Sequence, residues 1–163
     1  MQEFEEILQE KITAVLAETL ENMAFLDVDE SSREEVEELE GKRLSVTLMV
    51  AKPILLELRL EMDEELLLQV VETVYTMDRD DITEQQVEDL LAEFLNTLAG
   101  RFMAEVLPED QTFALNLPEI NDDDNDFSET DSHSFYYLAD ELPVIVELTS
   151  ANGDELAELL SDS

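Results

Sequence analysis

The order of helical and β-rich segments constrains the fold of this chain more than any other feature of its sequence. Two long segments have apolar residues at helical spacing, and each is followed by β-rich segments. The expected helices are 2–26, one beginning near Asp63, 83–104 and 152–160, and the expected strands are 43–50, 54–62, 112–120, 133–139 and 143–149. Helices and strands do not alternate strictly, as they would around a parallel sheet. The order therefore predicts an α+β fold with long helices packed on an antiparallel sheet and a loose internal duplication.

The length and apolar content fit one domain over residues 1–163. Apolar residues make up 44% of the 163 residues. This fraction is enough for a sizeable core, so the acidity of the chain does not by itself predict disorder.

The charge balance excludes one class of partner and leaves two interpretations open. The formal net charge is −36, from 44 acidic and 8 basic residues. Nucleic acid is excluded as a partner because binding to phosphates needs a basic patch. An anionic membrane surface is disfavoured for the same reason. The acidity indicates either attraction to a basic patch on a partner or a solvated, mutually repelling surface.

The sequence also indicates in which cellular compartment the protein is expected. The first ten residues, MQEFEEILQE, lack the basic-then-apolar pattern of a signal peptide, and no apolar run approaches the length of a membrane span. There is no cysteine, which excludes disulfide, thiolate and Cys-ligated metal chemistry. We therefore expect a cytoplasmic protein.

The segment EDLLAEFLNTLAGRF, residues 88–102, contains the strongest candidate site. Thr83 and Gln86 have the spacing of a capping box, which predicts where this helix begins. Its apolar residues gather on one side of a helical wheel, and four residues form a straight row on the opposite side. This outward row consists of Asp89, Glu93, Asn96 and Gly100.

The composition of the outward row indicates function. In an exposed helix interior, Asn costs several tenths of a kcal/mol and Gly about 1 kcal/mol relative to Ala. No packing on a solvent-facing side offsets this cost. Gly100 would allow another molecule to approach closely, and Asn96 would offer both a hydrogen-bond donor and an acceptor.

A Glu followed three residues later by Asn carries little weight by itself. With 28 Glu and 6 Asn in the chain, about one such pair is expected by chance, and one is present. The context of Glu93 and Asn96 raises its weight. The pair lies on a helix, faces outward and precedes a predicted strand closed by Pro118.

This combination resembles the CheX/CheC/FliY family of chemotaxis phosphatases. The family signature is Asp or Ser, then Glu four residues later, then Asn three residues after that, with Pro some twenty residues further on. DLLAEFLN supplies Asp89, Glu93 and Asn96, and NLPEI supplies Pro118. The sequence NTLAG after the Glu–Asn pair and the order of elements along nearly the whole chain also match.

The resemblance implies a phosphatase acting on the phospho-aspartate of a CheY-like response regulator, in chemotaxis or two-component signalling. Asn96 would orient the attacking water, and Glu93 would dock the partner by pairing with a lysine. Asp89 would give support. Because the regulator holds Mg²⁺, the enzyme would need no cofactor or metal of its own.

The number of motif copies distinguishes members of this family. The first long helix contains Asn22, but the residue three positions earlier is Thr19, and Asn22 falls beside the apolar stripe. We therefore interpret Asn22 as structural. A single motif places the chain closer to CheX than to CheC, and the resemblance to CheX implies a homodimer.

Two other candidate sites are weaker. Asp122, Asp124 and Asp126 match the first alternate ligands of an EF-hand loop, but Phe127 stands where that loop needs Gly and His133 where it needs Glu. A mobile acidic loop is the better interpretation. With one His and no Cys, zinc and Ser–His–Asp chemistry are disfavoured. The remaining alternative to a phosphatase is a non-catalytic binding module of the same fold that holds a signalling partner.

Overall fold

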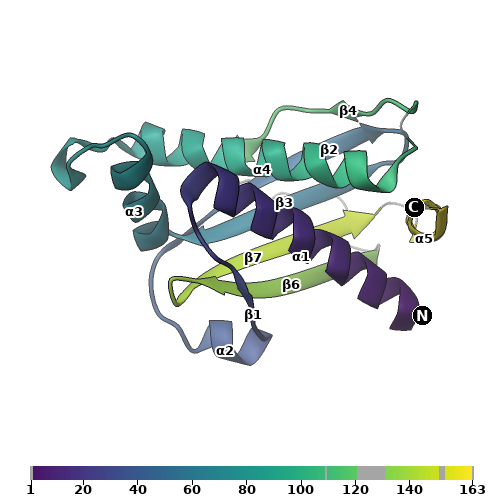
Figure 1. Cartoon of the computed structure of the whole chain (residues 1–163), viewed down its shortest axis with the longest axis horizontal. Helices are drawn as coiled ribbons and strands as arrows, with labels where there is room; N and C mark the ends of the chain where they lie inside the picture. Colours follow the sequence, from purple (N-terminus) through teal and green to yellow (C-terminus); the bar gives the residue numbers. More distant parts are fainter. Residues whose placement is uncertain (1, 109, 121–130, 151–152, 163) are drawn as a thin grey trace.

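Long helices and an antiparallel sheet alternate along the chain in the order expected from its periodicity (Figure 1). The computed structural model describes residues 2–108, 110–120, 131–150 and 153–162. The helices are α1 Gln2–Ala24, α2 Arg33–Glu37, α3 Glu64–Val74, the short 3-10 helix η1 Arg79–Asp81, α4 Glu84–Val106 and α5 Gly153–Asp162. The strands are β1 Asp29–Glu30, β2 Arg43–Lys52, β3 Leu56–Asp63, β4 Ala114–Leu115, β5 Glu119–Ile120, β6 Asp131–Ala139 and β7 Leu142–Ser150.

The centre of the sheet is built from two hairpins placed side by side. The strand order is β1-β6-β7-β3-β2-β4, and β5 also pairs with β2. The hairpin β2–β3 and the hairpin β6–β7 meet where β3 pairs with β7 in an antiparallel register from Leu56↔Ser150 to Met62↔Val144. In the β6–β7 turn both Asp140 and Glu141 have positive φ, the conformation of a two-residue turn that matches the twist of antiparallel strands. The predicted α+β fold is confirmed.

The topology also confirms the internal duplication. Each half of the chain contributes a long helix, then short edge pairing, then a hairpin, then a shorter helix. The edge strand of each half crosses to the other half. Thus β1 pairs with β6, whereas β4 and β5 pair with β2. The two halves therefore exchange edge strands and share one sheet.

The helices α1 and α4 cover the same face of the sheet (Figure 1). The sheet residues that face them are apolar and fully buried, as at Leu48, Leu58 and Val146. The two helices contact each other, and Arg101 on α4 forms an ion pair with Glu18 on α1 at 3.5 Å. Because the apolar side chains of the strands face α1 and α4, one side of α4 packs against the sheet and the other side is exposed.

Some expectations from the sequence need correction. The single strand expected over residues 112–120 is two short strands, β4 and β5, because Pro118 lacks the N–H that a continuous ladder would need. The sequence does not predict the pairing of β1 with β6 or the 3-10 helix η1. The connection between α1 and β2 also contains the short helix α2. Asp122, Asp124 and Asp126 lie outside the described residues.

Within the part of the chain that the structure describes, no helix combines the length and apolar character needed to cross a bilayer.

Candidate functional site

The start of α4 is fixed by a capping box, as the sequence predicted. The hydroxyl of Thr83 accepts a hydrogen bond from the Gln86 backbone N–H at 3.1 Å, and the Gln86 side chain accepts one from the Thr83 backbone N–H at 2.9 Å. These two bonds satisfy N–H groups that a helix start would otherwise leave unpaired. The helix then runs unbroken to Val106.

The apolar side of α4 fixes which residues face outward. Ten of its residues are buried against the sheet and the neighbouring helices, and they recur at helical spacing: Val87, Leu90, Leu91, Phe94, Leu95, Leu98, Ala99, Phe102, Met103 and Val106. Rotating α4 about its axis would expose these side chains and bury carboxylates, at a cost of several kcal/mol. The orientation of the helix is therefore set by its own sequence.

The outward row lies where the sequence placed it. Asp89, Glu93 and Asn96 are exposed, and Gly100 is partly exposed. A Cβ atom added at Gly100 would meet no atom within 4 Å, so nothing in the fold requires glycine there. The space outside this position is open to another molecule.

Polar groups of the outward row are available to a partner. Asp89 Oδ1 accepts a hydrogen bond from Gln85 Nε2 at 2.7 Å, which orients that carboxylate. Among the described residues, the side chains of Glu93 and Asn96 form no hydrogen bond or ion pair within the chain. The row therefore presents a free carboxylate and a free amide about one helical turn apart.

This arrangement allows binding and orientation rather than independent chemistry. An amide can accept from and donate to a water molecule, and a carboxylate can pair with a cation. Neither group is a nucleophile activated by a neighbouring base. Among the described residues, no group of three or more His, Asp or Glu side chains is arranged to hold a metal ion. A reaction at this row would need its reactive group on the partner.

The corresponding surface of α1 lacks this pair. Asn22 is exposed, rather than packed against the apolar stripe as its wheel position had suggested. Thr19, three residues earlier, is buried, and its hydroxyl donates to the Val15 carbonyl at 2.7 Å. The residue that would have to act with Asn22 thus points into the core.

No sequence pattern predicts the hollow that lies beside the outward row. This hollow has a volume of about 260 Å³ and is lined by Tyr75, Met77, Gln86 and Asp89. We call it the Tyr75 hollow. Tyr75 and Met77 lie in the connection between α3 and α4, so their place beside Asp89 depends on how that connection folds. The sequence has no periodicity from which the path of this connection could be predicted.

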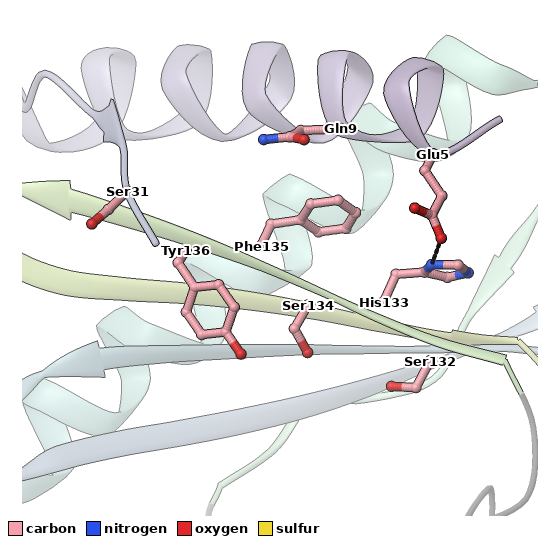
Figure 2. Close-up of a pocket in the computed structure, with 8 residues that line it drawn as sticks. All are labelled: Glu5, Gln9, Ser31, Ser132, His133, Ser134, Phe135 and Tyr136. Atoms are coloured by element: carbon pink, nitrogen blue, oxygen red, sulfur yellow. Dashed lines mark ion pairs between the residues drawn. The ribbon is translucent and has the colours of Figure 1, made fainter. Parts of the chain in front are cut away.

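A larger and more polar hollow lies away from the row, between α1 and the edge of β6 (Figure 2). It has a volume of about 370 Å³. Glu5 on α1 forms an ion pair with His133 on β6 at 3.9 Å, and the ring of His133 meets the edge of Phe4. His133 is held by these two contacts. The strand order separates this edge from the strands beside β2.

The comparisons with known proteins agree with the fold. The family model described as "Chemotaxis phosphatase CheX" matches residues 45–138. No curated protein sequence matches the chain significantly.

Solved structures with the same fold share little sequence with this chain. CheX from Vibrio vulnificus is 16% identical with a TM-score of 0.67, covering 85% of this chain and 95% of that one. A CheC-like superfamily protein from Shewanella sp. PV-4 is 16% identical with a TM-score of 0.69, covering 90% and 98%. The CheX–CheY–BeF3–Mg²⁺ complex from Borrelia burgdorferi contains a chain that is 17% identical with a TM-score of 0.61, covering 86% and 95%.

Proposed function

Because this chain belongs to the CheX family of chemotaxis phosphatases, we propose that it is a hydrolase that removes the phosphoryl group from the phospho-aspartate of a CheY-like response regulator. The observation that carries this proposal is the free pair Glu93 and Asn96 on the outward face of α4. Both side chains are exposed and available to a second protein, on a helix whose orientation the core fixes.

The chemistry of an acyl phosphate suits a site of this kind. Water attacks phosphorus in line, a P–O bond to water forms, and the P–O bond to the aspartyl oxygen breaks. The aspartate carboxylate leaves, inorganic phosphate is released, and the proton from water goes to the phosphate. A Mg²⁺ ion on the regulator would neutralise the charge on the phosphoryl oxygens.

The proposed contribution of this chain is to position the water. The Asn96 amide would hold the attacking water in line with phosphorus, and it would do so without acting as a base. Glu93 would pair with a basic residue near the phosphorylated aspartate and fix the docking geometry. Asp89, already oriented by Gln85, would support the docked partner. Gly100 would allow the partner to come close to α4.

The Borrelia complex supports the choice of partner. Its components are CheX, CheY, BeF3 and Mg²⁺. Beryllium trifluoride on a carboxylate stands in for a phosphoryl group. By analogy, we propose a phosphorylated CheY-like regulator in the cytoplasm as the partner of this chain, with the metal ion brought by the regulator.

We also propose that the chain forms a homodimer through the edge of β6. The Ser31 N–H donates to the Tyr136 carbonyl at 2.8 Å, so Tyr136 directs its backbone groups away from β7. By the alternation of an antiparallel ladder, Ser132 and Ser134 do the same. Among the described residues, no strand pairs with the outward backbone groups of Ser132 and Ser134, and such an edge readily accepts another strand.

A proline substitution tests this dimer. Ser134→Pro removes one outward N–H and is tolerated on an edge strand, so the protein should stay folded but become monomeric. Ser134→Ala keeps the N–H and should leave the dimer intact. Sedimentation or light scattering of both variants measures the outcome. A dimer that survives Ser134→Pro would place the interface elsewhere, and a monomeric wild-type protein would contradict the proposal.

The phosphatase function is tested with the response regulators of the source organism. Each regulator is phosphorylated in the presence of Mg²⁺, and loss of phosphate is followed with and without this protein. We expect faster loss from at least one regulator. If a regulator binds but loses phosphate at its intrinsic rate, the chain is the non-catalytic binding module that remains as the alternative, using its acidic surface or the outward row to hold its partner.

A further inference from the structure

We propose that the Tyr75 hollow binds a lysine or arginine side chain of the docked regulator and so helps to select the partner. This inference rests on the proposed function, because it assigns the hollow to the same docking surface. The hollow would take the aliphatic stem of the basic side chain, and Asp89 would take its charged head.

The lining of the hollow combines apolar surface with one oriented carboxylate. Tyr75 is an exposed large hydrophobic residue, with half of its surface accessible. Met77 lies beside it, and Asp89 stands at the rim with its carboxylate held by Gln85. An aromatic face and a thioether next to a carboxylate suit a side chain that is apolar along its length and positive at its tip.

The hollow is held in place before any partner binds. Arg79, in the same connection between α3 and α4, forms ion pairs with Glu65 at 2.9 Å and Glu72 at 2.6 Å on α3. Gln86 belongs to the capping box of α4, and its Nε2 donates to Met77 Sδ at 3.4 Å. Contacts to both helices therefore fix the connection, and a fixed pocket loses little conformational entropy on binding.

The hollow lies within the area that a partner docked on Asn96 must cover. Asp89 belongs both to the hollow and to the outward row, so both open on the same face of α4. It precedes Asn96 by seven residues, which is about 10 Å along a helix. A standard interface buries about 800 Å² per partner, roughly a disc of 16 Å radius. A globular partner centred on Asn96 would therefore extend over the hollow.

Charge decides between a basic and an apolar occupant. An apolar side chain would fill the hollow but would leave the Asp89 carboxylate desolvated and without a counter-charge. A lysine or arginine pairs with that carboxylate as it covers the apolar lining. The net charge of −36 further favours a cation.

The test measures binding of the identified regulator, held in its phosphorylated form by beryllium fluoride and Mg²⁺, to a set of variants. Tyr75→Ala should weaken binding about tenfold, whereas Tyr75→Phe should retain most of the affinity because the ring remains. Asp89→Asn should weaken binding less and reduce its salt dependence. Because both residues contact one side chain, their combined effect should be smaller than the product of the single effects. Leu55→Ala, which removes another exposed apolar side chain on the turn between β2 and β3, is the control and should bind like the wild type.

Thermal unfolding of each variant separates loss of binding from loss of folding. In steady-state assays, the loss in Tyr75→Ala should appear in KM rather than in kcat. Wild-type affinity in Tyr75→Ala, or an unchanged salt dependence in Asp89→Asn, would overturn the inference while leaving the phosphatase function standing. A wild-type protein that binds without speeding phosphate loss would instead refute the phosphatase function, and the same binding series would still decide whether the hollow is used.

Discussion

The two long helices α1 and α4 occupy equivalent places in the duplicated fold but use their polar residues differently. Both pack on the same face of the sheet, and each has 23 residues. On α1, the Thr13 hydroxyl donates to Glu30 on β1 and shares a hydrogen bond with Tyr137 on β6, and Thr19 bonds to its own helix. On α4, Glu93 and Asn96 have no such partners among the described residues.

This difference separates residues that maintain the fold from residues that are free to act. The bond to Thr13 belongs to the packing of α1 on the sheet, where burial raises the pKa of Tyr137 to about 12. Removing such a bond costs about 1 kcal/mol of stability. Glu93 and Asn96 give nothing to stability by contacts within the described chain. Their effect should therefore appear in partner binding and in the reaction.

The largest expected effect comes from Asn96→Ala, with Asn22→Ala on α1 as its matched control. Loss of the group that orients water should lower the rate of dephosphorylation about 100-fold. Because Ala is the better helix former, stability should stay the same or rise by several tenths of a kcal/mol. Asn22→Ala should change stability similarly and leave the rate unchanged. Equal rates in the two variants would remove the proposed role of Asn96.

A smaller effect is expected from Glu93→Ala. Loss of its pairing with a basic group should weaken binding of the phosphorylated regulator about tenfold, with less change in the rate once the regulator is bound. Glu10→Ala removes an exposed carboxylate from α1 and should leave binding close to that of the wild type. Titration of the regulator with each variant measures affinity. If Glu10→Ala weakens binding as much as Glu93→Ala, general charge rather than a specific pair would explain the effect.

The smallest effect on function is expected from Gly100→Ala, which should weaken binding slightly while raising stability. The added methyl group meets no atom within 4 Å, so stability should rise by about 1 kcal/mol and Tm by about 2–4 °C. If the partner approaches the backbone there, binding should weaken a few-fold. Ala14→Gly on the exposed side of α1 should lower Tm by a similar amount without affecting binding. A more stable Gly100→Ala protein with unchanged affinity would mean that the partner does not approach this position closely.

Periodicity is sufficient to predict α1, α3, α4, α5 and the two hairpins, because burial of one face of a helix or strand imposes a periodic pattern of apolar residues. The apolar stripe of α4 also predicts that Asp89, Glu93 and Asn96 face outward, since it fixes the opposite side of the helix. Periodicity does not predict β1, whose two residues are exposed and carry no pattern. The Tyr75 hollow cannot be predicted from periodicity either, because it depends on the path of the connection between α3 and α4 rather than on either helix alone.

A turnover measurement tests the proposed phosphatase activity most directly. A phosphorylated cognate regulator, with Mg²⁺, is mixed with this protein at a concentration well below that of the regulator, and released phosphate is followed over time. We expect each copy of the protein to dephosphorylate many regulator molecules, and we expect Asn96→Ala at the same concentration to lose this effect while still binding. Release of phosphate at the intrinsic rate of the regulator, with wild-type protein bound, would contradict the proposed activity.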